Sequence, residues 1–205
     1  VVHLDTVTLN QAPQSSIDYE AHLADLVAEA SVVAEAAAGA GVKRVIMASA
    51  AYVYGDQDGA EVDESAHLHP FNPLYKAMLN AEKAVLNSGV AAYALRAGFV
   101  YGGGSSGLQE IAELLKRGRA VLSGSGHAGW IHEDDLVAAV ALLVTKDFDD
   151  AGTSTIYNVV DDNPVTANAF MDAFGEAFGV GAPAKSASVL NKWTVSKIQR
   201  ELLQD

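Results

Sequence analysis

Apolar and polar residues alternate along the chain with two different periods. Between residues 17 and 38 apolar side chains recur three or four positions apart, which is the period of an amphipathic helix, and Gly39 follows as its stop. Residues 45–48 instead form an unbroken apolar run of strand length, typical of a strand that is covered on both faces. Pro73 is a favoured first residue for a second predicted helix, which closes at Gly89.

The same alternation continues to the end of the chain. Strands that alternate with helices argue for a parallel sheet with helices packed on its faces. The predicted fold class is therefore α/β, with a doubly wound parallel sheet. Its other predicted strands are 1–4, 91–96, 120–122 and 155–160, and its other helices are 108–117, from Asp134 or Asp135 to 144, from the cap Thr166 to 178, and the tail from 185.

The length of 205 residues corresponds to one domain with a small appendage. We expect a main domain over residues 1–160 and a small C-terminal lobe over residues 161–205. The sequence starts inside a predicted strand and without Met, so we also expect that Val1 is not the first residue of the gene product.

The composition and net charge of the chain argue against some classes of binding partner. Thirteen basic residues stand against 26 acidic ones, which gives a net charge of −13. A surface this negative repels phosphate groups, so we expect no nucleic-acid partner and no membrane partner. The longest apolar run, residues 136–144, is about half as long as a bilayer requires. The absence of cysteine excludes disulfides and thiolate metal sites, and it suits a cytoplasmic protein.

Two glycine-rich segments and a histidine-containing loop carry weaker signals. Residues 102–107 and 124–129 both fit G-x-G-x-x-G, but neither is followed at a suitable place by the acidic residue that a dinucleotide site needs. We interpret both as turns or substrate-side loops, with pyrophosphate binding as the alternative. His67 and His69 lie near three acidic residues without a clear ligand set, so no metal site is predicted.

Five segments carry a family resemblance. Residues 1–4 (VVHL) are similar to a fourth strand that usually reads V-I-H-L-A, and residues 40–55 to a fifth strand with its S-S-x-x-V-Y-G turn. Residues 95–102 (LRAGFVYG) are similar to L-R-P-x-x-V-Y-G, residues 130–136 to V-H-V-D-D-V, and residues 157–159 to Y-N-V. In this order and spacing they resemble the NAD-dependent epimerase/dehydratase group of the extended short-chain dehydrogenase/reductases.

This resemblance implies a Rossmann-like sheet that lacks its first strands here. The family's pyrophosphate-binding glycines lie on a strand–helix turn upstream of residue 1, by roughly 60 residues or more. The resemblance also implies NAD or NADP as the cofactor, with weak or no binding by the truncated chain. It implies a small-molecule substrate, such as a nucleotide sugar or a related carbonyl or alcohol compound, and a homodimer of the kind that family members often form.

The residues at the family's catalytic positions differ from its pattern. Relatives use a Ser or Thr, and a Tyr-x-x-x-Lys pair on one helix. Aligning residues 72–73 and 81–85 with N-P-Y-x-x-S-K-x-x-A-E-K-A-V places Leu74 at the Tyr position and Met78 at the Lys position. The same register places Ala50 at the Ser position. Leu74, Met78, Ala81 and Val85 form one apolar stripe, which favours a packed face over a reactive one.

Tyr75 is the nearest substitute for the missing tyrosine. Successive helix residues point about 100° apart, so Tyr75 and Lys76 cannot reproduce a pair that shares one face. Shifting the register by one residue places Tyr75 correctly but leaves Leu79 at the Lys position. Tyr75 is therefore the candidate catalytic residue of an unorthodox site, with Tyr52 and His127 as further candidates. The alternative is a non-catalytic NAD(P)-binding sensor or scaffold.

Ligands of open parallel sheets bind at the carboxyl ends of the strands. Asp5 stands where relatives have a small residue, and a carboxylate that faces a diphosphate is unfavourable unless it turns to solvent. By resemblance, the nicotinamide half of the cofactor is lined by Leu4, Asp5, Thr6, Ser49, Ala50, Ala97, Gly98, Phe99 and Val100.

Overall fold

The computed structural model of the chain divides into two compact units. The first unit comprises residues 1–98 and 134–160, and the second comprises residues 99–133 and 161–205. The second unit thus also takes in residues 99–133, which the sequence analysis grouped with residues 1–160. The structure describes residues 1–4, 16–103, 108–109, 112–113, 116–117, 127–147 and 152–179.

The first unit is built on a parallel sheet of four strands. Their order is β1 (Val2–His3), β2 (Arg44–Ala50), β3 (Ala91–Ala97) and β7 (Ser154–Val159), and each neighbouring pair is parallel. Every residue of β3 is buried, as expected for an inner strand with a neighbour on each side. The predicted α/β fold with a parallel sheet is confirmed.

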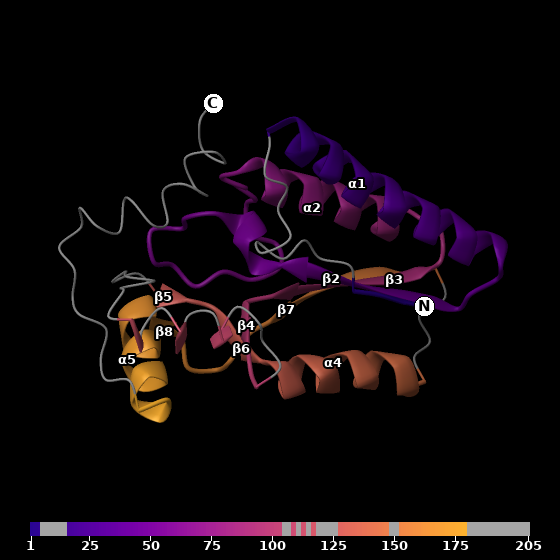
Figure 1. The fold of residues 1–205 in the computed structure, drawn as a ribbon. Helices are drawn as coiled ribbons and strands as arrows, with labels where there is room; N and C mark the ends of the chain where they lie inside the picture. Colours follow the sequence, from indigo (N-terminus) through magenta and orange to yellow (C-terminus); the bar gives the residue numbers. More distant parts are fainter. Residues whose placement is uncertain are drawn as a thin grey trace. The chain divides into compact units, whose positions relative to one another are not determined.

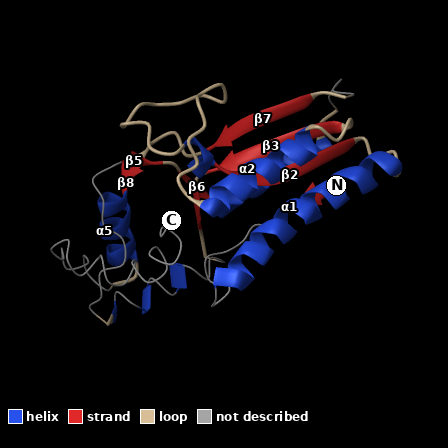
Figure 2. Cartoon of the chain, turned by 90° about the horizontal axis from the view of Figure 1, so that it is seen from above, coloured by secondary structure: helices blue, strands red, loops and turns tan. Residues whose placement is uncertain are grey.

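Helices cover both faces of this sheet. Helices α1 (Ser16–Gly39) and α2 (Pro73–Leu86) lie on one face, and α4 (Glu133–Thr145) lies on the other (Figure 1). From above, α1 and α2 run next to each other over the strands (Figure 2). Helix α4 begins at Glu133, one residue before the earliest start that the sequence predicted.

Side chains of β2 alternate between the two helical layers, as the two-residue period of a strand requires. Val45 and Met47 pack into the cluster beneath α1 and α2, whereas Ile46 packs with Leu143 of α4 on the opposite face. Because both faces of the strand are covered, its sequence is an unbroken apolar run rather than an alternating one.

The amino end of α2 is fixed by a side-chain cap. Asn72 has an extended backbone, its side chain accepts a hydrogen bond from the backbone N–H of Tyr75 at 2.9 Å, and Pro73 occupies the first helical position. Both residues suit a helix start, because the cap satisfies one exposed N–H and proline has none to satisfy.

Removing this cap gives a first testable expectation. Asn72→Ala is expected to destabilise the protein by about 1 kcal/mol, because the N–H of Tyr75 loses its acceptor. Urea unfolding measures the loss. Asn72→Asp keeps an acceptor oxygen and should stay within about 0.5 kcal/mol of the parent. An equal loss in both variants would show that the cap is not the reason.

Aromatic rings contact one another in the described part of the second unit. Strand β4 (Phe99–Tyr101) pairs in parallel with β6 (Trp130–His132), and β5 (His127–Ala128) pairs antiparallel with β8 (Val165–Thr166). Thr166 caps α5 (Ala167–Ala177), which confirms the predicted helix start. Phe170 of α5 stacks on Trp130 with ring centroids 3.8 Å apart.

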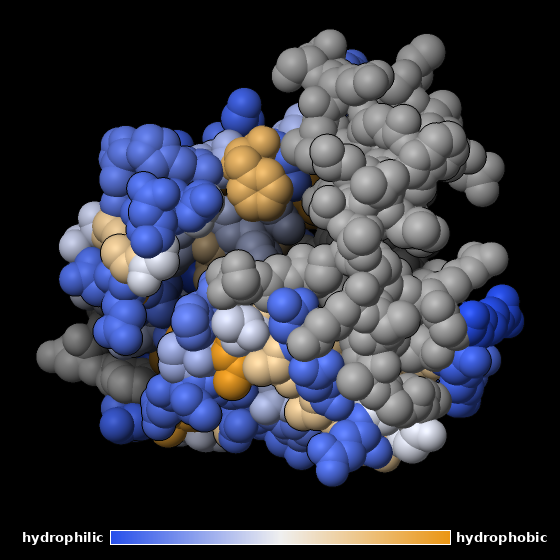
Figure 3. Space-filling view, turned by 90° about the vertical axis from the view of Figure 1, so that its left-hand side faces the viewer, coloured by the Kyte–Doolittle hydropathy of each residue, from blue (hydrophilic) through white to orange (hydrophobic). Residues whose placement is uncertain are grey.

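Several predicted features fall outside the described residues. They are the strand at 120–122, the helical tail from residue 185 and most of the two glycine-rich segments. Among the residues that the structure describes, no helix is long and apolar enough to cross a membrane. Hydrophilic residues predominate on the described part of the face in Figure 3, in keeping with the net charge of −13.

Candidate functional site

The residues predicted to line a ligand are found at the carboxyl ends of the strands. Ala50 at the end of β2 is paired with Ala97 at the end of β3, and Ala97 is paired with Val159 at the end of β7. Ser49 precedes Ala50 and is buried, and Leu4 directly follows β1. The first unit therefore brings Leu4, Ser49, Ala50, Ala97 and Gly98 to one edge of its sheet.

The other four predicted residues do not belong to this group. Asp5 and Thr6 lie outside the described residues. Phe99 and Val100 belong to the second unit, where Phe99 contacts the ring of Trp130 and Val100 is exposed.

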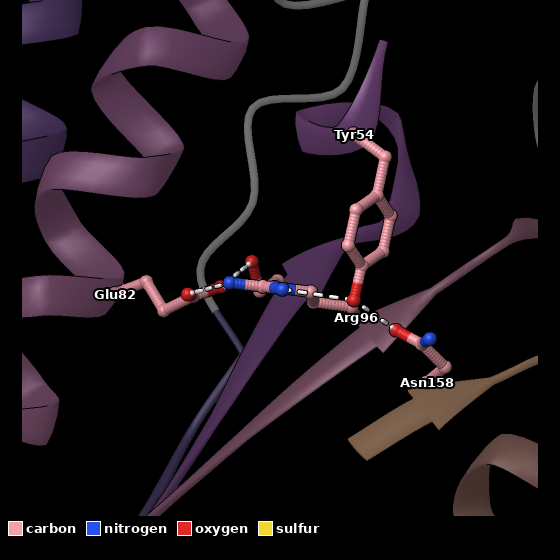
Figure 4. A network of polar contacts seen from close by, with 5 residues as sticks. Tyr54, Glu82, Arg96 and Asn158 are labelled. Atoms are coloured by element: carbon pink, nitrogen blue, oxygen red, sulfur yellow. Dashed lines mark hydrogen bonds and ion pairs between the residues drawn. The ribbon is translucent and has the colours of Figure 1, made fainter. Parts of the chain in front are cut away.

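A buried ion pair lies directly behind this edge (Figure 4). Arg96 of β3 and Glu82 of α2 are only 2% and 1% exposed. Nη2 of Arg96 donates to Oε1 of Glu82 at 2.6 Å, and its Nε donates to Oε2 at 3.1 Å. The hydroxyl of Ser49 also donates to Oε2, at 2.7 Å. The carboxylate of Glu82 thus accepts three hydrogen bonds, two from Arg96 and one from Ser49. These bonds offset the free-energy cost of burying its charge.

The network continues from Arg96 to the edge of the sheet. Nη1 of Arg96 donates to the hydroxyl of Tyr54 at 2.8 Å, and that hydroxyl donates to Oδ1 of Asn158 at 2.7 Å (Figure 4). Burial disfavours the charge of Arg96, but the hydrogen bonds with Glu82 and Tyr54 outweigh it, and the pKa of Arg96 is raised. Arg96 therefore remains charged, as a structural element of β3.

The same network holds the loop that follows β2. The backbone N–H of Asn158 donates to Glu64 at 2.7 Å, and Nδ2 of Asn158 donates to the carbonyl of Val62 at 3.3 Å. Gly55 begins this loop with a φ of +70°, and a Cβ there would run into the carbonyl of His69. These contacts fix the residues between β2 and α2, which include the candidate site.

The face of α2 that carries Leu74 and Met78 is packed. Leu74 and Met78 are 5% and 6% exposed and belong to the core cluster of the first unit. Ala81 and Val85 complete the stripe and are fully buried. The predicted apolar stripe of α2 is confirmed. A leucine and a methionine in this environment have no proton to exchange.

Tyr75 packs against the same core cluster and also contacts two other rings. Its ring stacks on Tyr52 with centroids 5.3 Å apart and meets Phe71 edge to face at 5.0 Å. Burial raises the pKa of Tyr52 well above its ordinary value, and the nearby Tyr75 adds to the shift. Tyr52 is therefore a neutral phenol at any physiological pH. Phe71, Tyr75 and Tyr52 together are called the aromatic cluster below.

The histidines considered for catalysis or metal binding do not form one group. His127 is an exposed residue of β5 in the second unit. His67 and His69 contact each other edge to face at 4.4 Å. The part of the chain that the structure describes contains no group of three or more His, Cys, Asp or Glu residues that could hold a metal ion.

The strand ends fit the flat ring of a nicotinamide. Ala50, Ala97 and Gly98 have the smallest side chains available, so a planar ring can approach the backbone closely. Their edge of the sheet is also where open parallel sheets bind ligands.

The chain belongs to the NAD dependent epimerase/dehydratase family, whose sequence pattern matches residues 1–159. A curated relative from Streptomyces, 3-diazoavenalumate denitrifying reductase, is 27% identical over 159 residues. That match covers 73% of this chain and 51% of the relative, so the chain spans about half the relative's length.

Solved structures show the same fold. MoeE5 in complex with UDP-glucose and NAD matches with a TM-score of 0.74 and 23% identity, over 92% of this chain and 66% of that chain. A UDP-glucose 4-epimerase from Thermotoga maritima, solved with UDP-glucose, matches with a TM-score of 0.68 and 20% identity, over 98% of this chain and 70% of that chain.

Proposed function

We propose that the intact protein is an NAD(P)-dependent oxidoreductase that acts on a nucleotide sugar or a related small carbonyl or alcohol compound without a tyrosine–lysine proton relay. Family membership and the small residues at the strand ends support cofactor binding. In this proposal Leu4, Ser49, Ala50, Ala97 and Gly98 contact the nicotinamide half. Ala50, Leu74 and Met78 take the positions of the family's Ser, Tyr and Lys.

The observation that carries the proposal is the packing of Leu74 and Met78. Both side chains lie inside the hydrophobic core of the first unit, where an ionisable group would be costly. The proton-handling positions have thus become structural, and the face of α2 stabilises the fold instead of activating a substrate.

A bound nicotinamide cofactor supplies or accepts a hydride. In this proposal the protein's own residues orient the ring. Because Leu74 and Met78 carry no ionisable group, the proton that accompanies the hydride is taken up from solvent when a carbonyl is reduced and released to solvent when an alcohol is oxidised. The buried pair of Glu82 and Arg96 holds β2, β3 and α2 in register, so that the strand ends keep one geometry.

The test is NAD(P)H consumption by the intact protein over a panel of carbonyl compounds, with UDP-glucose and UDP-galactose included. Turnover of at least one class supports the proposal. Clear cofactor binding without turnover of any compound would refute the catalytic proposal.

A second candidate is a non-catalytic NAD(P)-binding sensor or scaffold. The packed face of α2 favours it equally well, because it preserves the sheet while removing the proton relay. Titration calorimetry of the intact protein separates the candidates. Dinucleotide binding without turnover supports the sensor, and the absence of dinucleotide binding would exclude both.

A further inference from the structure

We propose that the aromatic cluster of Phe71, Tyr75 and Tyr52 is the substrate-binding surface of the site, and that it takes the flat ring of an aromatic carbonyl compound in preference to a sugar. The hydroxyl of Tyr52 donates a hydrogen bond to the substrate's oxygen. This inference rests on the proposed function, because it assigns the substrate class of the same site.

The local sequence brings the three rings to the end of β2. Tyr52 lies in the short helical turn Ala51–Tyr54, two residues after the last residue of β2. Tyr75 lies in the first turn of α2, where the Asn72 cap binds its backbone N–H. Phe71 directly precedes that cap. Ala50 and Tyr75 pack against the same core cluster of the first unit, and Tyr52 follows the carboxyl end of β2 by two residues. The three rings therefore extend from the region where β2 ends.

The exposure of the rings differs in a way that suits a binding surface. Tyr52 and Tyr75 are half-buried, whereas Phe71 is 56% exposed. A large apolar ring left in water gains free energy when a second apolar surface covers it. The ring of Tyr75 between its two neighbours holds them in one continuous aromatic surface, with centroid distances of 5.3 and 5.0 Å.

Tyr52 adds one polar group to this surface. Its hydroxyl has no hydrogen-bond partner among the residues that the structure describes, and its raised pKa keeps the proton on the oxygen. A neutral phenol in this state is a ready donor to a carbonyl oxygen. It can therefore perform the substrate-orienting task that the serine performs in relatives and that Ala50 cannot.

The chemistry of the cluster favours an aromatic ring over a sugar. Aromatic rings attract one another through offset stacking and edge-to-face contacts, which need no additional polar partner. A sugar has several hydroxyl groups, and each one that is desolvated without a partner is costly. The three rings therefore offer a planar aromatic compound more favourable contacts than a sugar, and the Tyr52 hydroxyl can donate to its carbonyl oxygen.

The test compares two aldehydes of similar size, benzaldehyde and cyclohexanecarbaldehyde, which differ in whether the ring is flat and aromatic. Their dissociation constants are measured by ligand-observed NMR on the intact protein with NAD present, with UDP-glucose as a third ligand. We expect benzaldehyde to bind about tenfold more tightly than cyclohexanecarbaldehyde. Because the readout is binding, it remains informative if the protein turns over none of these compounds.

Variants of Phe71 and Tyr52 test whether the aromatic cluster causes the preference for benzaldehyde. Phe71→Ala and Phe71→Leu are both expected to reduce the preference for benzaldehyde to less than about threefold, since leucine restores the bulk but not the aromatic face. Tyr52→Phe should weaken both aldehydes about equally, by roughly fivefold, and leave the preference intact. Val32→Ala, on the exposed side of α1, is the control and should change nothing.

Three results would overturn the inference. They are equal affinity for the two aldehydes, a preference that survives Phe71→Ala, or UDP-glucose binding that is tighter than benzaldehyde binding and insensitive to both Phe71 variants. Failure of the proposed function has a different signature, namely dinucleotide binding without turnover of any compound, or no dinucleotide binding at all.

Discussion

Glu82→Ala is expected to destabilise the protein by about 3–5 kcal/mol, among the largest losses that a single substitution can cause here. The variant leaves the guanidinium of Arg96 buried without its carboxylate, and it also removes the acceptor of the Ser49 hydroxyl. An uncompensated buried charge costs far more than the lost attraction alone. Urea unfolding of the variant and the parent measures the difference.

Matched variants show whether the loss of stability comes from the broken ion pair or from any substitution in α2. Lys83→Ala changes the next residue, which is exposed, and should cost less than about 0.5 kcal/mol. Replacing both partners in Glu82→Leu/Arg96→Met should cost clearly less than Glu82→Ala, because no charge is then left buried. A loss below 1 kcal/mol for Glu82→Ala would show that Arg96 reaches water and that the network is not a buried structural element.

Met78→Lys is expected to destabilise the protein by about 3 kcal/mol or more. The new ammonium group would enter the cluster that contains Leu74, Ala81 and Val85, where it loses its hydration. The carboxylate of Glu82, four positions further along α2, is already bonded to Arg96 and Ser49. The substitution also introduces the residue type that the family resemblance would place at this position. The stability of the variant therefore shows whether this face of α2 is part of the hydrophobic core or lines an open active site.

Asn80→Lys is the matched control for Met78→Lys. It introduces the same side chain two residues away on the exposed side of α2, and it should change stability by no more than about 0.5 kcal/mol. Thermal and urea unfolding of the two variants give the comparison. If Met78→Lys proves as stable as Asn80→Lys, position 78 faces solvent or a cleft, and the packed-face interpretation is wrong.

The elements of the first unit could be predicted because their signals are local. The helical period of residues 17–38 and the start at Pro73 correspond to α1 and α2, and the apolar run 45–48 lies inside β2. The order of the family-like motifs also predicted that Ala50 and Ala97 end neighbouring strands. The pairing of β2 with β3 confirms that these two residues lie opposite each other. Local period and motif spacing are sufficient for these features.

The buried network could not be predicted from the same signals. Its contacts join residues far apart in the sequence, such as Ser49 with Glu82 and Tyr54 with Asn158, which are separated by 33 and 104 positions. The available hint was Arg96, a single charge inside the otherwise apolar segment 91–100, whereas Glu82 lies next to Lys83 and gave no such signal. Charges in such segments are rarely buried without a partner, and only the tertiary fold shows which partner is used.

The aromatic cluster illustrates the same limit. From the sequence, Tyr75 and Tyr52 are separate candidates for proton transfer. The structure stacks their rings on each other and adds Phe71, a residue that no motif singled out. Side-chain direction on the first turn of α2 decides this contact, because Tyr75 and Leu74 point about 100° apart.

The pH profile of turnover tests most directly whether α2 lacks a proton relay. It is measured for the intact protein from about pH 6 to about pH 9, on whichever carbonyl compound of the panel is reduced fastest, for the parent and for Tyr75→Phe. We predict a flat kcat in both proteins, within about twofold of each other, because Leu74 and Met78 do not ionise and Tyr52 stays neutral in this range. A kcat that changes tenfold per pH unit through an apparent pKa, and loses this dependence in Tyr75→Phe, would contradict the account.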